Sequence, residues 1–121
     1  MRSLVCIVSF TFALLAGSVG ARAAELVMVE QAGCHWCAQW NAEIGHIHPK
    51  TEEGRRAPLR RVDLRDLPDD IVFASPPVFT PTFVLVEDGA ELGRIEGYAG
   101  DEFFWFLLGN LLNAHLASEG G

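Results

Sequence analysis

The chain has 121 residues, half of them apolar, and carries 16 acidic side chains against nine basic ones. This length and composition predict one compact domain. The acidic balance argues against a nucleic-acid partner, because general binding of that kind depends on basic side chains that neutralise phosphates.

The start of the chain has the pattern of a secretory signal peptide, which we assign to residues 1–23. An arginine supplies a positive charge near the start, residues 4–16 are almost continuously apolar, and Ala21-Arg22-Ala23 matches the small-x-small pattern of a cleavage site. The apolar run is too short to span a bilayer stably. We therefore expect an exported protein that is not embedded in the membrane after cleavage, with residues 24–121 as its single folded domain.

A buried strand and an amphipathic helix are predicted next. Residues 25–31 (ELVMVEQ) form a β-rich apolar run that is broken by Gly33. Apolar residues then recur at a spacing of three to four, which predicts one face of a helix that ends before Pro49. The residues of this face are Trp36, Cys37, Trp40, Ile44 and Ile47.

The middle of the chain is expected to hold one strand between irregular segments. Residues 50–58 (KTEEGRRAP) predict a polar loop, and the alternation in residues 59–64 (LRRVDL) predicts a strand with one solvated face. Residues 65–79 are expected to be irregular, with a short helical turn near residues 68–73. The arginines around this strand can form a docking patch for an acidic partner or, as we favour, a solvated face balanced by aspartates.

A β-hairpin and a helix complete the pattern. The hairpin pairs residues 82–86 with residues 91–96 across a turn at Glu87-Asp88-Gly89. Asp101 can cap the last helix, and Trp105 is expected to point off its buried face. The residues of that face are Phe103, Phe104, Leu107, Leu108, Leu111 and Leu112. The order is β-α-β-β-β-α, and the first two strands, joined through a helix, imply a parallel pair with a right-handed crossover.

Cys34 and Cys37 stand where the first strand passes into the first helix, and cleavage of the signal peptide would remove the other cysteine, Cys6. A domain of this size folds without a covalent staple, and a bridge across so short a loop adds little stability. The pair therefore favours redox chemistry. Haem attachment of the c type requires a histidine directly after the second cysteine, and Ala38 stands there.

Metal binding is the competing use of the pair. A structural zinc site usually needs a second ligand pair, and the spacing of His46 and His48 is not that of a zinc finger. We expect no metal site and no cofactor. Capture of copper stays open, because Cu(I) prefers thiolate ligands. A module that uses the pair to hold a metal or a partner without turnover is thus the alternative from another functional class.

The position of each cysteine predicts its role in a dithiol mechanism. Cys34, at the helix N-terminus, faces unsatisfied N–H groups and the positive end of the helix dipole, so we expect it to be the attacking thiolate. Cys37, one turn inward, would resolve the mixed disulfide. A charged His35 would make the disulfide more oxidising, whereas a solvated His35 would have little influence. We expect Trp36 at the rim of the site, where an aromatic side chain can contact substrate.

Three segments resemble the thioredoxin family: CHWC after a strand, TPTF (residues 80–83) at the start of the hairpin, and GRIEGYAGDEFFWFL leading into the last helix. The resemblance covers nearly the whole expected mature chain. It implies an α/β thioredoxin-like fold with a mixed central sheet flanked by helices. In that family the proline before the hairpin is cis and lies against the cysteine pair, which implies the same for Pro81 and gives Thr80 a substrate strand to pair with. The residues alone leave a trans Pro81 equally open.

A narrower resemblance concerns the SoxS type of small periplasmic thioredoxin, encoded with bacterial sulfur-oxidation systems. It rests on the segments CHWCAQWNAEIG and PKTEEGRRAPLRRVDL. It implies a periplasmic thiol–disulfide oxidoreductase that reduces cysteines of exported partners, notably a sulfur-carrier protein. Because the periplasm is held oxidising, such a reductase implies a membrane thiol reductant as its electron donor. A disulfide oxidant or isomerase is the alternative within redox chemistry.

The sequence departs from the family in two places. Thioredoxins have a buried acid six residues before the first cysteine, and Met28 stands there. Deprotonation of Cys37 therefore needs another acceptor, such as Glu30 or a water, or is simply slower. In addition, Gly33 replaces the usual tryptophan before the pair, and His-Trp replaces Gly-Pro within it. The redox potential cannot be carried over from the family.

Overall fold

The computed structural model describes residues 24–117, and the signal-peptide prediction for residues 1–23 lies outside this range. The strands are β1 (Glu25–Glu30), β2 (Leu59–Asp63), β3 (Thr82–Glu87) and β4 (Ala90–Glu96). The helices are α1 (His35–Trp40), α2 (Glu52–Arg56) and α3 (Asp101–His115). A π-helical segment (Asn41–Gly45) continues α1, and a 3-10 turn (His48–Lys50) precedes α2.

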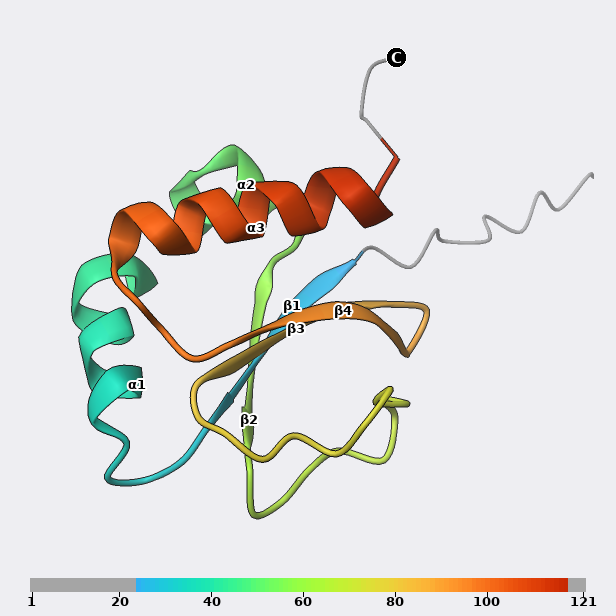
Figure 1. Ribbon diagram of the computed structural model, residues 1–121. Helices are drawn as coiled ribbons and strands as arrows, with labels where there is room; N and C mark the ends of the chain where they lie inside the picture. Colours follow the sequence, from blue (N-terminus) through green and yellow to red (C-terminus); the bar gives the residue numbers. More distant parts are fainter. Residues whose placement is uncertain (1–23, 118–121) are drawn as a thin grey trace, which may run out of the picture.

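The strands form one mixed sheet in the order β2-β1-β3-β4 (Figure 1). β1 and β2 run parallel, whereas β3 is antiparallel to both β1 and β4. The predicted parallel pair and hairpin are thus confirmed. The hairpin turns at Asp88 and Gly89, whose φ angles of 53° and 75° are those that a tight two-residue hairpin requires.

The helices cover one face of the sheet, and the segment between β2 and β3 covers the other (Figure 1). β1 and β3 are apolar on both faces, because side chains alternate along a strand and both faces are buried. The core on the helix face includes Leu26, Met28, Phe83, Leu85, Trp40, Ile44, Phe104, Leu108 and Leu112. The core on the opposite face includes Val27, Val29, Val62, Ile71, Val84 and Val86. Trp40 is fully buried, as predicted.

Helix α2 lies within residues 50–58, where we expected a loop, so that prediction was wrong. Thr51 caps the helix, because its hydroxyl accepts the N–H of Gly54 at 3.0 Å. Two acidic residues stand in the first turn and two arginines in the last, the arrangement that suits a helix dipole. The cap and the charges explain why a polar segment with a glycine is helical.

Other local predictions were wrong in part or in full. Residues 68–73 contain a turn at Asp69 and Asp70 but no helix. Val72 instead donates its N–H to the Gly89 carbonyl at 2.7 Å and fastens this segment to the hairpin. Ile47 lies beyond the first helix and is 41% exposed. In α3 the cap residue is Gly100, and Phe103 is exposed because the buried stripe follows Phe104, Leu108 and Leu112.

His48 is a fully buried polar residue of the helix layer. Its Nε2 atom lies 3.1 Å from the carbonyl oxygen of Ala57, and its ring stacks on Trp105 with centroids 6.2 Å apart. Desolvation by this burial lowers the pKa of His48 below its usual value. Trp105 is therefore held against the core rather than pointing away from it.

Gly54→Ala is expected to lower the free energy of unfolding by at least about 2 kcal/mol, as in other overpacked sites. Gly54 is buried, and a Cβ atom there would overlap the carbonyl oxygen of His48. Gly109→Ala is the matched control, because its Cβ would meet nothing within 4 Å and should stabilise α3 by about 0.5–1 kcal/mol. Urea unfolding measures both variants, and equal stabilities would contradict the close approach at Gly54.

Candidate active site

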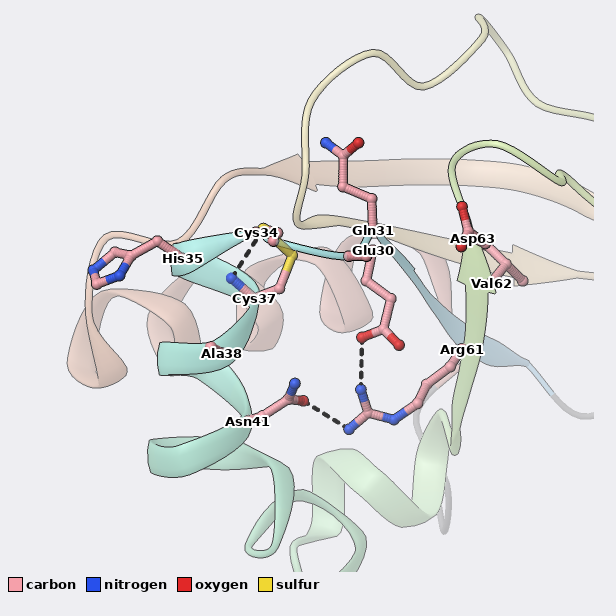
Figure 2. A pocket seen from close by; sticks show the side chains of 12 residues that line it. Glu30, Gln31, Cys34, His35, Cys37, Ala38, Asn41, Arg61, Val62 and Asp63 are labelled. Atoms are coloured by element: carbon pink, nitrogen blue, oxygen red, sulfur yellow. Dashed lines mark hydrogen bonds and ion pairs between the residues drawn. A yellow bond between two sulfur atoms is a disulfide. The ribbon is translucent and has the colours of Figure 1, made fainter.

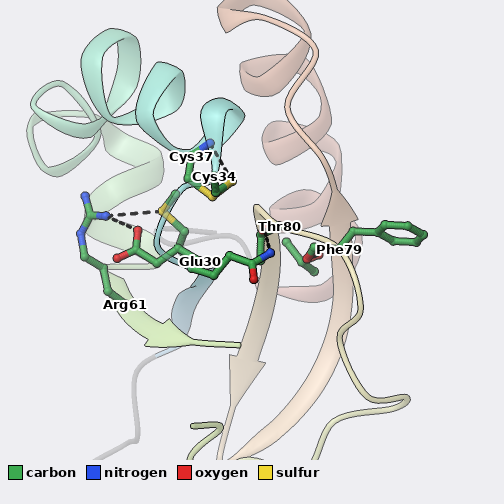
Figure 3. Close-up of a disulfide and its surroundings, with 9 residues drawn as sticks. Glu30, Cys34, Cys37, Arg61, Phe79 and Thr80 are labelled. Carbon is green, nitrogen blue, oxygen red and sulfur yellow. Dashed lines mark hydrogen bonds and ion pairs between the residues drawn. A yellow bond between two sulfur atoms is a disulfide. The ribbon is translucent and has the colours of Figure 1, made fainter. Parts of the chain in front are cut away.

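The cysteine pair lies at the junction of β1 and α1 and forms a disulfide (Figure 3). Gly33, with φ at 78°, turns the chain sharply before the helix. Cys34 is the cap residue of α1, and its sulfur accepts the N–H of Cys37 at 3.1 Å. Cys34 is partly exposed, whereas Cys37 is only 4% exposed. One sulfur is thus accessible to a partner, and the other belongs to a largely buried residue.

A groove of about 690 Å³ opens beside the disulfide, and both cysteines line it (Figure 2). Among the residues that line it, Arg61 donates to Glu30 at 2.7 Å and to Asn41 at 2.8 Å. The same guanidinium lies 3.7 Å from the sulfur of Met28. Met28 stands where thioredoxins have a buried acid. The groove nevertheless has an acidic side chain, because Glu30 lines it together with Arg61.

His35 and Trp36 occupy the first turn of α1, and both are exposed. Their rings meet edge to face with centroids 5.0 Å apart. Figure 2 shows His35 pointing away from Glu30 and Arg61. Trp36 is 52% exposed, which leaves its ring free to contact a partner.

The segment before β3 carries the other predicted site residues. The Thr80–Pro81 peptide bond is cis, as the family resemblance implies. Gln31, directly after β1, donates its side-chain N–H to the Thr80 hydroxyl at 2.9 Å. Phe79 precedes this pair and is 62% exposed. Figure 3 draws Phe79 and Thr80 among the surroundings of the disulfide. The structure therefore brings the two parts of the predicted site together.

The segment after β4 also contacts the residues before β3, at Pro81. The N–H of Gly97 donates to the Pro81 carbonyl at 2.8 Å. Next to it, the hydroxyl of Tyr98 donates to Glu43 at 2.9 Å. Desolvation, together with this carboxylate, raises the pKa of Tyr98 to about 12. Tyr98 thus remains a neutral donor that ties this segment to the end of the first helix.

Some residues of the site were missed by the sequence analysis. They are Gln31, Asn41, Arg61 and Phe79. Gln31 and Asn41 make contacts that span 49 and 20 positions of the chain, and no local pattern marks such partners. The apolar residues before the TPTF motif were the one available signal, because adjacent exposed apolar side chains favour a binding surface.

Metal binding was the competing use of the cysteine pair in the sequence analysis, and we searched the described part of the chain for clusters of metal ligands. Residues 24–117 hold no group of three or more His, Cys, Asp or Glu side chains that could bind a metal ion. His48, considered as a ligand from the sequence, is buried against Ala57 instead. Over the same range, no helix is both long and apolar enough to cross a membrane.

No protein-family model matches the chain, and no curated protein matches it. Among solved structures, it is similar to the reduced form of the periplasmic thioredoxin SoxS from Paracoccus pantotrophus, with 49% sequence identity and a TM-score of 0.73. The match covers 74% of this chain and 96% of that chain.

Two more distant thioredoxins share the fold. Mala s 13 of Malassezia sympodialis has 16% identity and a TM-score of 0.50, with 75% of this chain and 76% of that chain covered. Thioredoxin-2 of a malaria parasite has 17% identity and a TM-score of 0.52, with 74% and 84% covered. With 49% identity over nearly all of SoxS, the chain belongs to the thioredoxin family and is a SoxS homologue whose redox-active pair is Cys34 and Cys37.

Proposed function

We propose that this protein is a periplasmic thiol–disulfide oxidoreductase that reduces disulfides in exported partner proteins. One observation carries the proposal: the Cys34–Cys37 disulfide, accessible at Cys34 and buried at Cys37, in a homologue of the periplasmic thioredoxin SoxS. The partner class that this homology suggests is a cysteine-containing carrier protein of sulfur oxidation.

The reaction starts from the dithiol form of the pair. The Cys34 thiolate attacks a sulfur of the partner's disulfide, forms a mixed disulfide and releases the partner's first thiolate. Cys37 then gives up its proton and attacks the sulfur of Cys34, which releases the second thiolate and closes the Cys34–Cys37 disulfide. The partner gains two electrons and two protons, and this protein loses them. The N–H that Cys37 directs at the Cys34 sulfur, at 3.1 Å, supports the negative charge on the nucleophile.

Glu30 is the proposed acceptor of the Cys37 proton. Its carboxylate and Cys37 line the same groove, which is open to solvent and can admit a water between them. The bond from Arg61 at 2.7 Å holds the carboxylate there, and Asn41 fixes the other side of the guanidinium at 2.8 Å. Arg61 and Asn41 thus act as positioning residues for this proton transfer.

The compartment and the electron donor follow from the same proposal. Residues 1–23 would direct export and be removed, and residues 24–121 would form the working domain. Each turnover leaves the pair oxidised, so electrons must be supplied again. In an oxidising periplasm the donor would be a membrane protein of the thiol-reductant class.

The reduction potential of the Cys34–Cys37 pair tests the direction of electron flow. We expect a value below about −200 mV, on the side of the reducing members of the fold and far from the strong oxidants near −120 mV. The protein is equilibrated in glutathione buffers of graded redox ratio, and in dithiothreitol buffers for lower potentials, and tryptophan fluorescence reports the state of the pair. A potential near that of the strong oxidants would favour the oxidant alternative and overturn the reducing direction. Cys34→Ser is the control and should give no transition.

A further inference from the structure

Gln31 contacts both parts of the site. Its main-chain carbonyl accepts the N–H of Cys34 at 3.3 Å, and its side-chain amide donates to the Thr80 hydroxyl at 2.9 Å. Figure 2 shows that its side chain points to the other side of β1 from Glu30, as neighbouring residues at a strand end do. One residue therefore joins the turn before the nucleophile to the segment before β3.

The main chain around Thr80 is anchored on both sides but is open at Thr80 itself. The Phe79 carbonyl accepts the hydroxyl of Thr82 at 2.7 Å, and the Pro81 carbonyl accepts the N–H of Gly97 at 2.8 Å. Across residues 24–117, nothing hydrogen-bonds to the N–H or the carbonyl of Thr80. These groups can pair with an extended segment of another protein, which is how a strand is added to an unpaired edge.

We propose that Gln31 is a positioning residue that holds the open main chain of Thr80 in register with Cys34, so that a partner segment pairing with Thr80 presents its disulfide to the Cys34 sulfur. The inference rests on the proposed function and deepens it. In this proposal Gln31 acts through Thr80 and takes no direct part in the exchange of sulfur bonds. Its loss should therefore weaken partner binding and leave the chemistry of a bound partner largely intact.

The test measures how fast the reduced forms of Gln31→Met, Thr80→Val and the double variant transfer electrons to insulin. Insulin serves as the protein that supplies the disulfide. Reduced protein is mixed with excess insulin, and tryptophan fluorescence gives the half-saturating insulin concentration and the limiting rate. Gln31→Met should raise the half-saturating concentration about two- to tenfold, the range for one neutral hydrogen bond, with a limiting rate within twofold. Thr80→Val should do the same, and the double variant should be no worse than either, because both remove one interaction.

Gln39→Met is the matched control, since it makes the same substitution on α1, and it should behave like the wild type. Unchanged half-saturation in Gln31→Met, or additive effects with Thr80→Val, would overturn the positioning role while the wild type still reduces insulin. Wild-type protein that does not reduce insulin would overturn the proposed function, and the inference with it. A fall in the limiting rate alone would assign Gln31 to the chemistry and also reject the proposal.

Discussion

The Cys37→Ser variant should accumulate a mixed disulfide with its partner, and Cys34→Ser should accumulate none. Cys34 is the accessible member of the pair, whereas Cys37 is 4% exposed and can only finish the exchange. Without Cys37, the partner stays bound through Cys34, because the thiol that would displace it is missing. Catalysed reduction of insulin should fall at least about 1,000-fold in both variants, as expected when a reacting group is removed.

Non-reducing gels of each reduced variant, mixed with insulin, measure the trapped species. The band should disappear with dithiothreitol and should be missing from the Cys34→Ser/Cys37→Ser double variant. Trapping by Cys34→Ser instead would exchange the two roles. Trapping by neither variant, with insulin reduction retained, would remove the pair from the reaction. The Cys37→Ser variant can then be used to capture the exported partner.

The sheet was predictable because its strands carry local signals. Apolar runs mark β1 and β3, and the turn at Asp88-Gly89 sets the hairpin. The miss at α2 has a local cause. The polar composition of residues 50–58 predicted a loop, although Thr51 is a good cap residue. In the structure the Thr51 hydroxyl accepts the N–H of Gly54 and caps the helix.

Only those features of the site that depend on residues close together in the sequence were predictable. The spacing of Cys34 and Cys37 and the turn at Gly33 predict a pair at a helix start. A cis Pro81 followed from the resemblance and not from the residues, because proline bonds of this kind are usually trans. The partners of Gln31 and Arg61 depend on how the strands pair, and Arg61 faces Met28 in that pairing. The spacing of residues along the sequence therefore does not predict such contacts.

The Glu30→Gln variant should resolve its mixed disulfide at least about tenfold more slowly than the wild type at pH 7, since a positioned base contributes a factor of about 100 or more. Glutamine keeps the shape of the side chain but removes the proton acceptor. Stopped-flow mixing of the reduced protein with an aromatic disulfide reagent separates the two steps, because attack by Cys34 releases one coloured thiol and attack by Cys37 releases the other. The second phase alone should slow.

The pH profile separates a base from a structural role. The rate in Glu30→Gln should rise about tenfold per pH unit and approach the wild type near pH 9, where a cysteine ionises without help. The other ionisable groups along the groove are His35, Arg61 and Asp63. Asp63→Asn is the matched control, because it removes the same charge from the same groove and should leave the second phase unchanged. Equal slowing in both variants would assign the effect to net charge. A Glu30→Gln deficit that persists at high pH would assign Glu30 to holding Arg61 and not to moving the proton of Cys37.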